Sequence, residues 1–221
     1  MDEKSSDAEL VAASPAIPQY AYRNADPTWP NRYIWPVLLQ ILEDNPTAAK
    51  RVFEIGSGNG ATANMLSNCG YSVVGIDPAV EGIEVARRNF PKATFHLGSA
   101  YDDLAGRYGT FPIVVSLEVI EHCFSPKAYL ETMFKLMEPG GLGIISTPFH
   151  NYWKNLALSL ADKWDSHLGP LWEGGHIKFF SEKTLAQALQ SAGFTDMDFR
   201  RAGRFSLMAK STVVAFRRPA K

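Results

Sequence analysis

Two carboxylates and an imidazole stand close together in the segment Glu118-Val-Ile-Glu121-His122. In a helical turn, positions i, i+3 and i+4 share one face, so we expect these side chains to converge. Two oxygens and one nitrogen form a ligand set suited to Mg²⁺, Mn²⁺, Co²⁺ or Zn²⁺. Alternatively, His122 acts without a metal as a general base, or the acids merely favour a helix start. The spacing leaves these three interpretations open.

A glycine-rich turn follows an apolar run in Val52-Phe-Glu-Ile-Gly-Ser-Gly-Asn-Gly60. Such glycines let the chain turn sharply from strand to helix and let a ligand approach the main chain. A second apolar run ends in Asp77, where a carboxylate can accept hydrogen bonds from a ribose diol. Together these features predict a nucleoside-bearing cofactor.

The glycine pattern is also compatible with a dinucleotide, because Gly56-x-Gly58-x-x-Ala61 fits that fingerprint. A pyrophosphate favours helix amides without an adjacent anion, whereas Glu54 stands directly before the loop. The cationic cofactor S-adenosylmethionine suits this acid better. A glycine turn without any ligand is the remaining alternative.

Apolar runs and amphipathic segments alternate along most of the chain, which indicates βαβ units and a mostly parallel sheet. The expected strands are Arg51–Ile55, Ser72–Ile76, Ala93–Leu97, Ile113–Leu117 and Leu142–Ser146. The expected helices are Asn31–Leu42, Ala61–Asn68, Val80–Asn89, Pro126–Met137 and Glu182–Ala192. Residues 138–141 are expected to form a turn.

The last part of the chain departs from this alternation. Phe194–Arg201 and Leu207–Arg218 read as consecutive strands with a connection too short for a parallel crossover, so they must pair antiparallel. We therefore expect an α/β, Rossmann-like sheet of seven strands, with helices on both faces and a terminal antiparallel β-hairpin. Residues 149–180 form a tryptophan-containing insertion, either a helical cap with its own small core or a lid that contacts substrate.

Composition sets broad limits on the class of protein. The 221 residues carry a formal charge of −1, which argues against nucleic acid as a partner. The two cysteines make no disulfide framework, and no apolar run reaches the roughly 18 residues of a membrane span. Residues 1–18 read as a disordered lead without a secretory signal. We expect a single cytoplasmic domain over residues 19–221.

Six motifs occur in order along the chain: Glu54-Ile-Gly-Ser-Gly-Asn-Gly60, Gly75-Ile-Asp77, Gly98-Ser-Ala100, Val115-Ser-Leu-Glu-Val-Ile-Glu-His122, Glu138-Pro-Gly-Gly141 and Ile145-Ser-Thr-Pro148. With these motifs, the chain resembles class I S-adenosylmethionine-dependent methyltransferases over residues 51 to about 217. Within that class it is similar to the ubiquinone-biosynthesis O-methyltransferase group.

The resemblance implies roles for particular residues. Asp77 would hold the ribose, and Gly98–Ala100 would border the adenine, although Ser99 replaces an acid common in relatives. His176 would complete a metal site with Glu118, Glu121 and His122, as in small-RNA 2′-O-methyltransferases. The residues expected to bind the cofactor are Glu54, Gly56, Ser57, Gly58, Gly60, Asp77, Ser99, Ala100 and Leu117.

The expected reaction is O-methylation of a small aromatic or polyketide-like hydroxyl compound. His122 or a bound Mg²⁺, Mn²⁺ or Zn²⁺ would activate the hydroxyl, and Tyr22, Trp153 and Trp172 would contact the acceptor. The alternatives are an N- or C-methyltransferase, an RNA 2′-O-methyltransferase and a non-catalytic S-adenosylmethionine-binding module. The sequence specifies neither the acceptor nor the oligomeric state.

Overall fold

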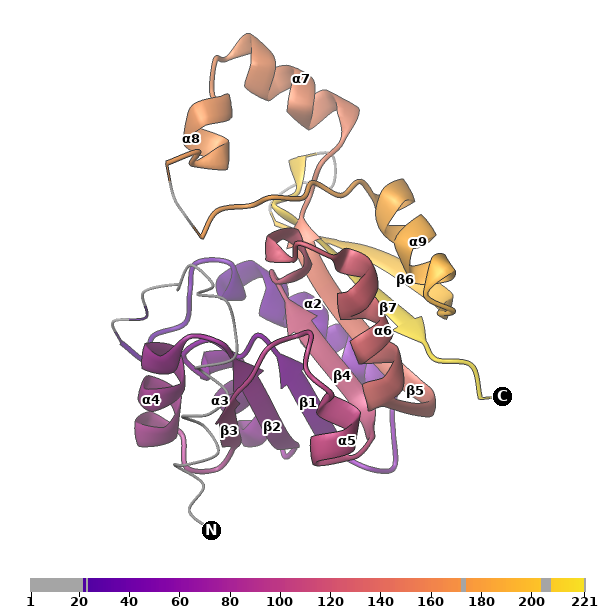
Figure 1. The fold of residues 1–221 in the computed structure, drawn as a ribbon. Helices are drawn as coiled ribbons and strands as arrows, with labels where there is room; N and C mark the ends of the chain where they lie inside the picture. Colours follow the sequence, from indigo (N-terminus) through magenta and orange to yellow (C-terminus); the bar gives the residue numbers. More distant parts are fainter. Residues whose placement is uncertain (1–21, 23, 172–173, 204–207, 221) are drawn as a thin grey trace.

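The computed structural model describes residues 22, 24–171, 174–203 and 208–220, and these residues build one seven-stranded sheet (Figure 1). The strand order is β3-β2-β1-β4-β5-β7-β6. The expected seven-stranded, mostly parallel sheet is thereby confirmed. The strands are β1 Arg51–Ile55, β2 Ser72–Asp77, β3 Thr94–Leu97, β4 Phe111–Leu117, β5 Met137–Pro148, β6 Thr195–Ala202 and β7 Ser211–Arg217.

Strand β7 runs antiparallel to both of its neighbours and forms the expected hairpin with β6. Val214 pairs with Ile145 of β5 on one side and with Phe199 of β6 on the other. The predicted pairing of the last two strands is therefore confirmed. Residues 204–207 of their connection, like the predicted lead at residues 1–18, lie outside the described residues.

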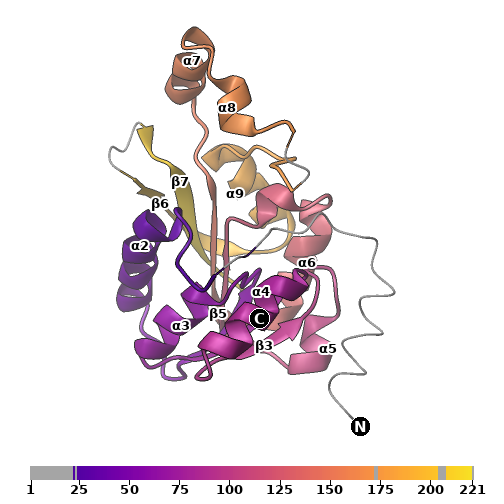
Figure 2. The same cartoon turned by 90° about the vertical axis from the view of Figure 1, so that its left-hand side faces the viewer.

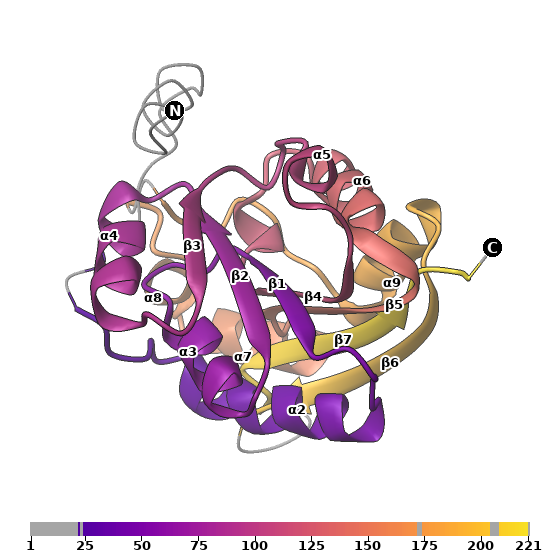
Figure 3. The ribbon, with the colours of Figure 1, turned by 90° about the horizontal axis from the view of Figure 1, so that it is seen from below.

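Helices cover both faces of the sheet, as Figure 3 shows from below. Because successive strand residues point to opposite faces, Val52 packs in one buried cluster and Phe53 in the other. The cluster with Val52 contains residues of the helices α2 Asn31–Asp44, α3 Ala61–Asn68 and α4 Val80–Asn89. The cluster with Phe53 contains residues of the helices α5 Leu104–Tyr108, α6 Pro126–Leu136 and α9 Glu182–Ser191.

Two local predictions differ from the structure. Residues 138–141 were expected to form a turn, but they belong to β5, which begins where Met137 pairs with Phe111 across an irregular register. The pattern also did not predict α5, a short helix whose N-cap Asp103 accepts a hydrogen bond from Gly106 N at 3.2 Å. A five-residue helix is too short for apolar periodicity to reveal it.

The insertion forms a helical cap beyond the end of the sheet. Its helices α7 (Tyr152–Leu160) and α8 (Trp164–Leu168) stand above the sheet in two perpendicular views (Figures 1 and 2). Neither helix contains a buried residue, so these two helices form no core of their own. Within the described part of the chain, no helix is long and apolar enough to cross a membrane.

Candidate cofactor and acceptor site

A cavity of about 1050 Å³ opens at the carboxyl edge of the strands. Open α/β sheets bind ligands at this edge, because the loops that follow the parallel strands meet there. Twelve of the residues predicted to bind ligands line the cavity: Tyr22, Glu54, Gly56, Ser57, Gly58, Asp77, Ser99, Ala100, Leu117, Glu118, His122 and His176.

The glycine loop between β1 and α3 adopts a conformation that suits glycine. Gly56 and Gly58 have φ angles of 80° and 52°, in the left-handed region that side chains disfavour. The amides of Gly56 and Ser57 both donate to the carbonyl of Ile76 at 2.8 Å. These bonds fix the loop against the end of β2 and expose its backbone to the cavity.

Gly60, predicted to bind the cofactor, has a packing role instead. It does not line the cavity, and a Cβ at this position would lie 2.7 Å from Ala86 Cβ and 2.8 Å from Phe95 Cζ. Its missing side chain lets α3 begin close to α4 and β3. The third glycine of a nucleotide-binding turn has this role in general, because it allows the helix to pack closely against the strand.

Asp77 lies at the end of β2 and is held rigidly by the loop. Its carboxylate accepts hydrogen bonds from Gly58 N and Ala79 N, each at 2.8 Å. Burial raises the pKa of Asp77 to about 6, while these two hydrogen bonds oppose the shift. Each oxygen retains acceptor capacity for a ligand hydroxyl, so the geometry is compatible with ribose binding.

Glu54 is a buried acid beside Asp77. Only 2% of its surface is exposed, and Oε2 has no hydrogen-bond partner among the described residues. Burial raises its pKa to about 8, and the neighbouring Asp77 charge adds to that shift. A cationic ligand would offset this cost, because an opposite charge favours the ionised carboxylate.

The loop after β3 borders the cavity with Ser99, Ala100 and a residue that the sequence interpretation missed, Asp102. The Asp102 carboxylate accepts a hydrogen bond from Ser99 N at 2.8 Å, and the Ser99 hydroxyl accepts one from Tyr101 N at 3.2 Å. The loop therefore does bring an acid to the cavity, three residues after Ser99 in the chain. The sequence contains this acid in the segment Gly98-Ser-Ala-Tyr-Asp102.

Tyr22 was predicted to contact the acceptor, but the structure places its ring over the glycine loop. A Cβ at Gly58 would lie 2.5 Å from Tyr22 Oη, and one at Gly82 would lie 2.8 Å from Tyr22 Cδ2. Asn59 Nδ2 holds the adjoining segment by donating to the carbonyls of Asn24 and Asp26 at 2.9 and 2.8 Å. Tyr22 therefore lies at the Asp77 end of the cavity.

The predicted helical turn at 118–122 is shorter than expected and does not include Glu118. This residue has a φ of 54°, and the turn that follows is a 3₁₀ helix, η1, over Ile120–His122. The Glu118 carboxylate accepts a hydrogen bond from Ser146 Oγ at 2.7 Å, and burial raises its pKa to about 7. The expectation that Glu118, Glu121 and His122 share one helical face is therefore wrong.

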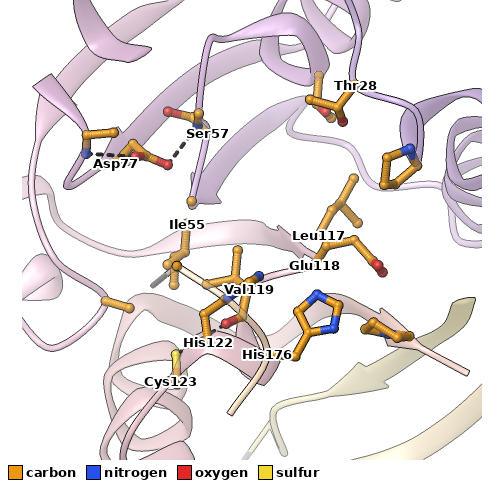
Figure 4. Close-up of a pocket in the computed structure, with 18 of the residues that line it drawn as sticks. Thr28, Ile55, Ser57, Asp77, Leu117, Glu118, Val119, His122, Cys123 and His176 are labelled. Carbon is orange, nitrogen blue, oxygen red and sulfur yellow. Dashed lines mark hydrogen bonds between the residues drawn. The ribbon is translucent and has the colours of Figure 1, made fainter. Parts of the chain in front are cut away.

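Tertiary structure instead gathers Glu121, His122 and His176, whose potential ligand atoms all lie within 4.8 Å of one another. The Glu121 carbonyl accepts hydrogen bonds from Ile177 N at 2.9 Å and Lys178 N at 3.0 Å. His122 Nδ1 lies 3.2 Å from the carbonyl of Gly175. These contacts hold the segment after the cap against η1, and the two histidine rings lie together beside the cavity (Figure 4).

The donor set fits a divalent cation. Glu121 is fully buried, and neither of its carboxylate oxygens has a hydrogen-bond partner among the described residues. Burial raises its pKa well above the ordinary value, and the Glu118 charge contributes. Burial also lowers the pKa of His122 and lowers that of His176 to about 4, so burial favours the neutral imidazole that a metal ligand requires.

The tryptophans predicted to contact the acceptor are not among the described lining residues. Trp153 is 61% exposed and packs edge-on against Tyr152, because α7 turns this side chain away from the cavity. Trp172 lies outside the described residues. Other residues of the insertion do line the cavity: Lys154, His167, Gly174, Gly175, His176 and Ile177. Of these, the sequence interpretation predicted only His176.

The fold and site define a class of protein. A parallel sheet closed by an antiparallel hairpin, with a glycine loop after β1 and an acid at the end of β2, is the architecture of class I S-adenosylmethionine-dependent methyltransferases. The chain belongs to the methyltransferase domain family, whose model matches residues 30–198. It is an S-adenosylmethionine-dependent methyltransferase.

Known relatives agree with this assignment. The chain is 30% identical over 169 residues to a ubiquinone biosynthesis O-methyltransferase of Aromatoleum aromaticum, covering 74% of this chain and 72% of that protein. It spans 63% of a relative with the same name from Cereibacter sphaeroides, at 30% identity over 69% of this chain.

A solved structure shows the same fold. Magnesium protoporphyrin IX methyltransferase from Synechocystis, crystallised with bound SAH, superposes with a TM-score of 0.64 at 18% identity. The match covers 84% of this chain and 81% of that one.

Proposed function

We propose that this methyltransferase transfers the methyl group of S-adenosylmethionine to a hydroxyl oxygen of a small aromatic or polyketide-like acceptor. The observation that carries the proposal is the group Glu121, His122 and His176 beside the cavity that Asp77 and the glycine loop line. Such a group activates a hydroxyl, which attacks well only after losing its proton. The relatives named as O-methyltransferases support the same reaction.

The protein's main task is to position the two reactants and exclude water, because methyl transfer is an in-line attack on the carbon next to the sulfonium. Asp77 and the Gly56–Gly58 loop would hold the nucleoside and methionyl parts. The acceptor would then occupy the part of the cavity near Glu118 and His122, which lies across from Asp77 in Figure 4.

His122 is suited to receive a proton. If Nδ1–H donates to the Gly175 carbonyl at 3.2 Å, Nε2 carries the lone pair. The lowered pKa keeps this lone pair available near neutral pH. In the metal-free alternative, His122 would take the hydroxyl proton directly.

In the metal-dependent alternative, Glu121, His122 and His176 would hold a divalent cation. When bound, Mg²⁺, Mn²⁺ or Zn²⁺ would lower the pKa of a nearby hydroxyl. The buried, unpartnered carboxylate of Glu121 supports this alternative, since an uncompensated buried carboxylate is costly.

Methylation of a catechol acceptor before and after exhaustive chelation tests the proposal. We expect chelation to abolish turnover, a divalent ion to restore it, and cofactor binding to persist throughout. Full activity after chelation together with an inactive His122→Ala variant would favour the general-base alternative. Transfer only to amine or carbon acceptors would overturn O-methylation.

A further inference from the structure

Two lysines line the part of the cavity near Glu118, and the proposed chemistry does not use them. Lys154 comes from α7 and reaches back toward the sheet, where its Nζ donates to the carbonyls of Phe149 at 2.7 Å and Ala209 at 3.3 Å. Lys210 precedes β7, and its Nζ lies 4.4 Å from the Trp29 ring centroid. Both cations therefore have defined positions at the cavity.

Neither lysine forms an ion pair within 4.0 Å with an acid in the described part of the chain. The carboxylate that acts electrostatically on Lys154 is Glu118, which is hydrogen-bonded to Ser146. Burial lowers the pKa of Lys154, Glu118 opposes that shift, and the charge of Lys210 adds to it. This end of the cavity thus holds two adjacent cations.

The cations and the cofactor acids occupy different parts of the cavity. Asp77 and Glu118 lie on opposite sides of the view in Figure 4, with His176 below Glu118 and His122 between the two sides. Lys154 interacts with Glu118, so its charge belongs to the acceptor side. An anion bound there would lie on the Glu118 side of the cavity, across from Asp77.

The donor capacity of the lysines suits a carboxylate. An ammonium has three N–H donors, and Lys154 uses two of them on main-chain carbonyls. Its third donor and the Lys210 ammonium can serve one anionic group. Two aromatic or imidazole walls, Tyr33 and His167, line the same cavity and can flank a planar ring.

We infer that the methyl acceptor carries a carboxylate, which Lys154 and Lys210 bind so that a hydroxyl on the same ring faces His122. The inference rests on the proposed function, because it assumes a small hydroxylated aromatic acceptor. Lys154 and Lys210 are then specificity-determining residues that orient the acceptor and take no part in proton transfer.

The test compares two ligands of nearly equal shape, 3,4-dihydroxybenzoate and the neutral 3,4-dihydroxybenzamide. Calorimetry on the enzyme saturated with S-adenosylhomocysteine gives the affinity of each. We expect the acid to bind wild type about tenfold to hundredfold more tightly than the amide, as a charge-assisted hydrogen bond would give. Lys154→Met and Lys210→Met should each reduce that preference, and the double variant should abolish it.

Lys163→Met is the matched control, since it removes the same charge from an exposed position of the cap. It should retain the preference of wild type. Lys210→Met keeps the test decisive if loss of the Lys154 contacts displaces α7, because Lys210 makes none of them. No preference for the acid in wild type, or a preference that survives in the double variant, would overturn the inference.

Product formation separates this inference from the proposed function. Preferential binding of the acid without methylation of either compound would sustain the carboxylate site and count against O-methylation of such acceptors. Equal binding and equal methylation of the two compounds would sustain O-methylation and overturn the carboxylate site.

Discussion

Ser146 Oγ donates a hydrogen bond to the Glu118 carboxylate at 2.7 Å, and the Ser146 carbonyl also accepts one from Glu118 N at 3.1 Å. These bonds tie Glu118 to β5. Glu121, three residues later, has no hydrogen-bond partner for its carboxylate among the described residues and lies with His122 and His176. Two acids that look equivalent in the sequence therefore have different environments.

We predict that Glu121→Gln weakens divalent-ion binding far more than Glu118→Gln. Loss of a ligand carboxylate should lower the affinity for Mn²⁺ or Zn²⁺ at least about tenfold, because even outer contacts of metal ligands matter on that scale. Glu118→Gln should leave the affinity close to that of wild type. Calorimetric titration with the metal ion measures the affinity of each variant. Equal losses of metal affinity in the two variants would contradict the separation of the two acids.

Asp77→Ala should lower the affinity for S-adenosylmethionine about tenfold to several-hundredfold, as expected for the loss of charge-assisted hydrogen bonds of about 1.5–3 kcal/mol each. The variant also removes the acceptor for Gly58 N and Ala79 N, so the loop itself should loosen. Titration calorimetry provides the measurement. Unchanged affinity would refute the assignment of Asp77, and added NAD should not compete.

Cofactor affinity should rise with pH between about pH 6 and 7.5, where an α-amino group is still largely charged. The pKa of Glu54 is raised from 4.5 to about 8 in the cofactor-free protein, so this acid is protonated over that range. A cationic cofactor favours the ionised form, so binding releases a proton and the affinity gains up to about tenfold per pH unit.

Glu54→Gln is the control for this prediction and should flatten the profile. The raised pKa of Glu54 has the opposite effect on the stability of the cofactor-free protein. The folded state holds a proton that the unfolded chain releases near pH 4.5, so stability should fall as pH rises from about 4.5 to 8. A wild-type affinity that is independent of pH would exclude Glu54 as the cation-binding acid.

Phe216→Ala should destabilise the fold by about 3–5 kcal/mol, the usual cost of deleting a fully buried phenylalanine. Phe216 is 0% exposed, and its ring centroid lies 4.6 Å from that of Phe194. This ring contact packs β7 against the residues that follow α9. Urea denaturation measures the loss. Phe124→Ala, at an 82% exposed position, should cost much less, and a similar loss at both positions would contradict this packing role.

The sequence alone determined most of the fold and the end of the cavity that Asp77 and the glycine loop line. The segments β1, α3 and α4 have the bounds predicted, because glycines and acids mark strand ends and apolar spacing marks the strands and helices. The glycine loop and Asp77 are adjacent for a topological reason: the carboxyl ends of neighbouring parallel strands meet at one edge. Local patterns therefore sufficed there.

Tertiary structure alone decided the grouping of Glu121, His122 and His176. Sequence spacing placed Glu118 with Glu121 and His122, but the left-handed conformation of Glu118 and its bond to Ser146 separate it from them. Main-chain hydrogen bonds from residues 177 and 178 to the Glu121 carbonyl bring His176 beside His122. Such contacts join residues more than fifty positions apart, and no local periodicity encodes them. For the same reason Lys154 enters the cavity while its neighbour Trp153 faces solvent.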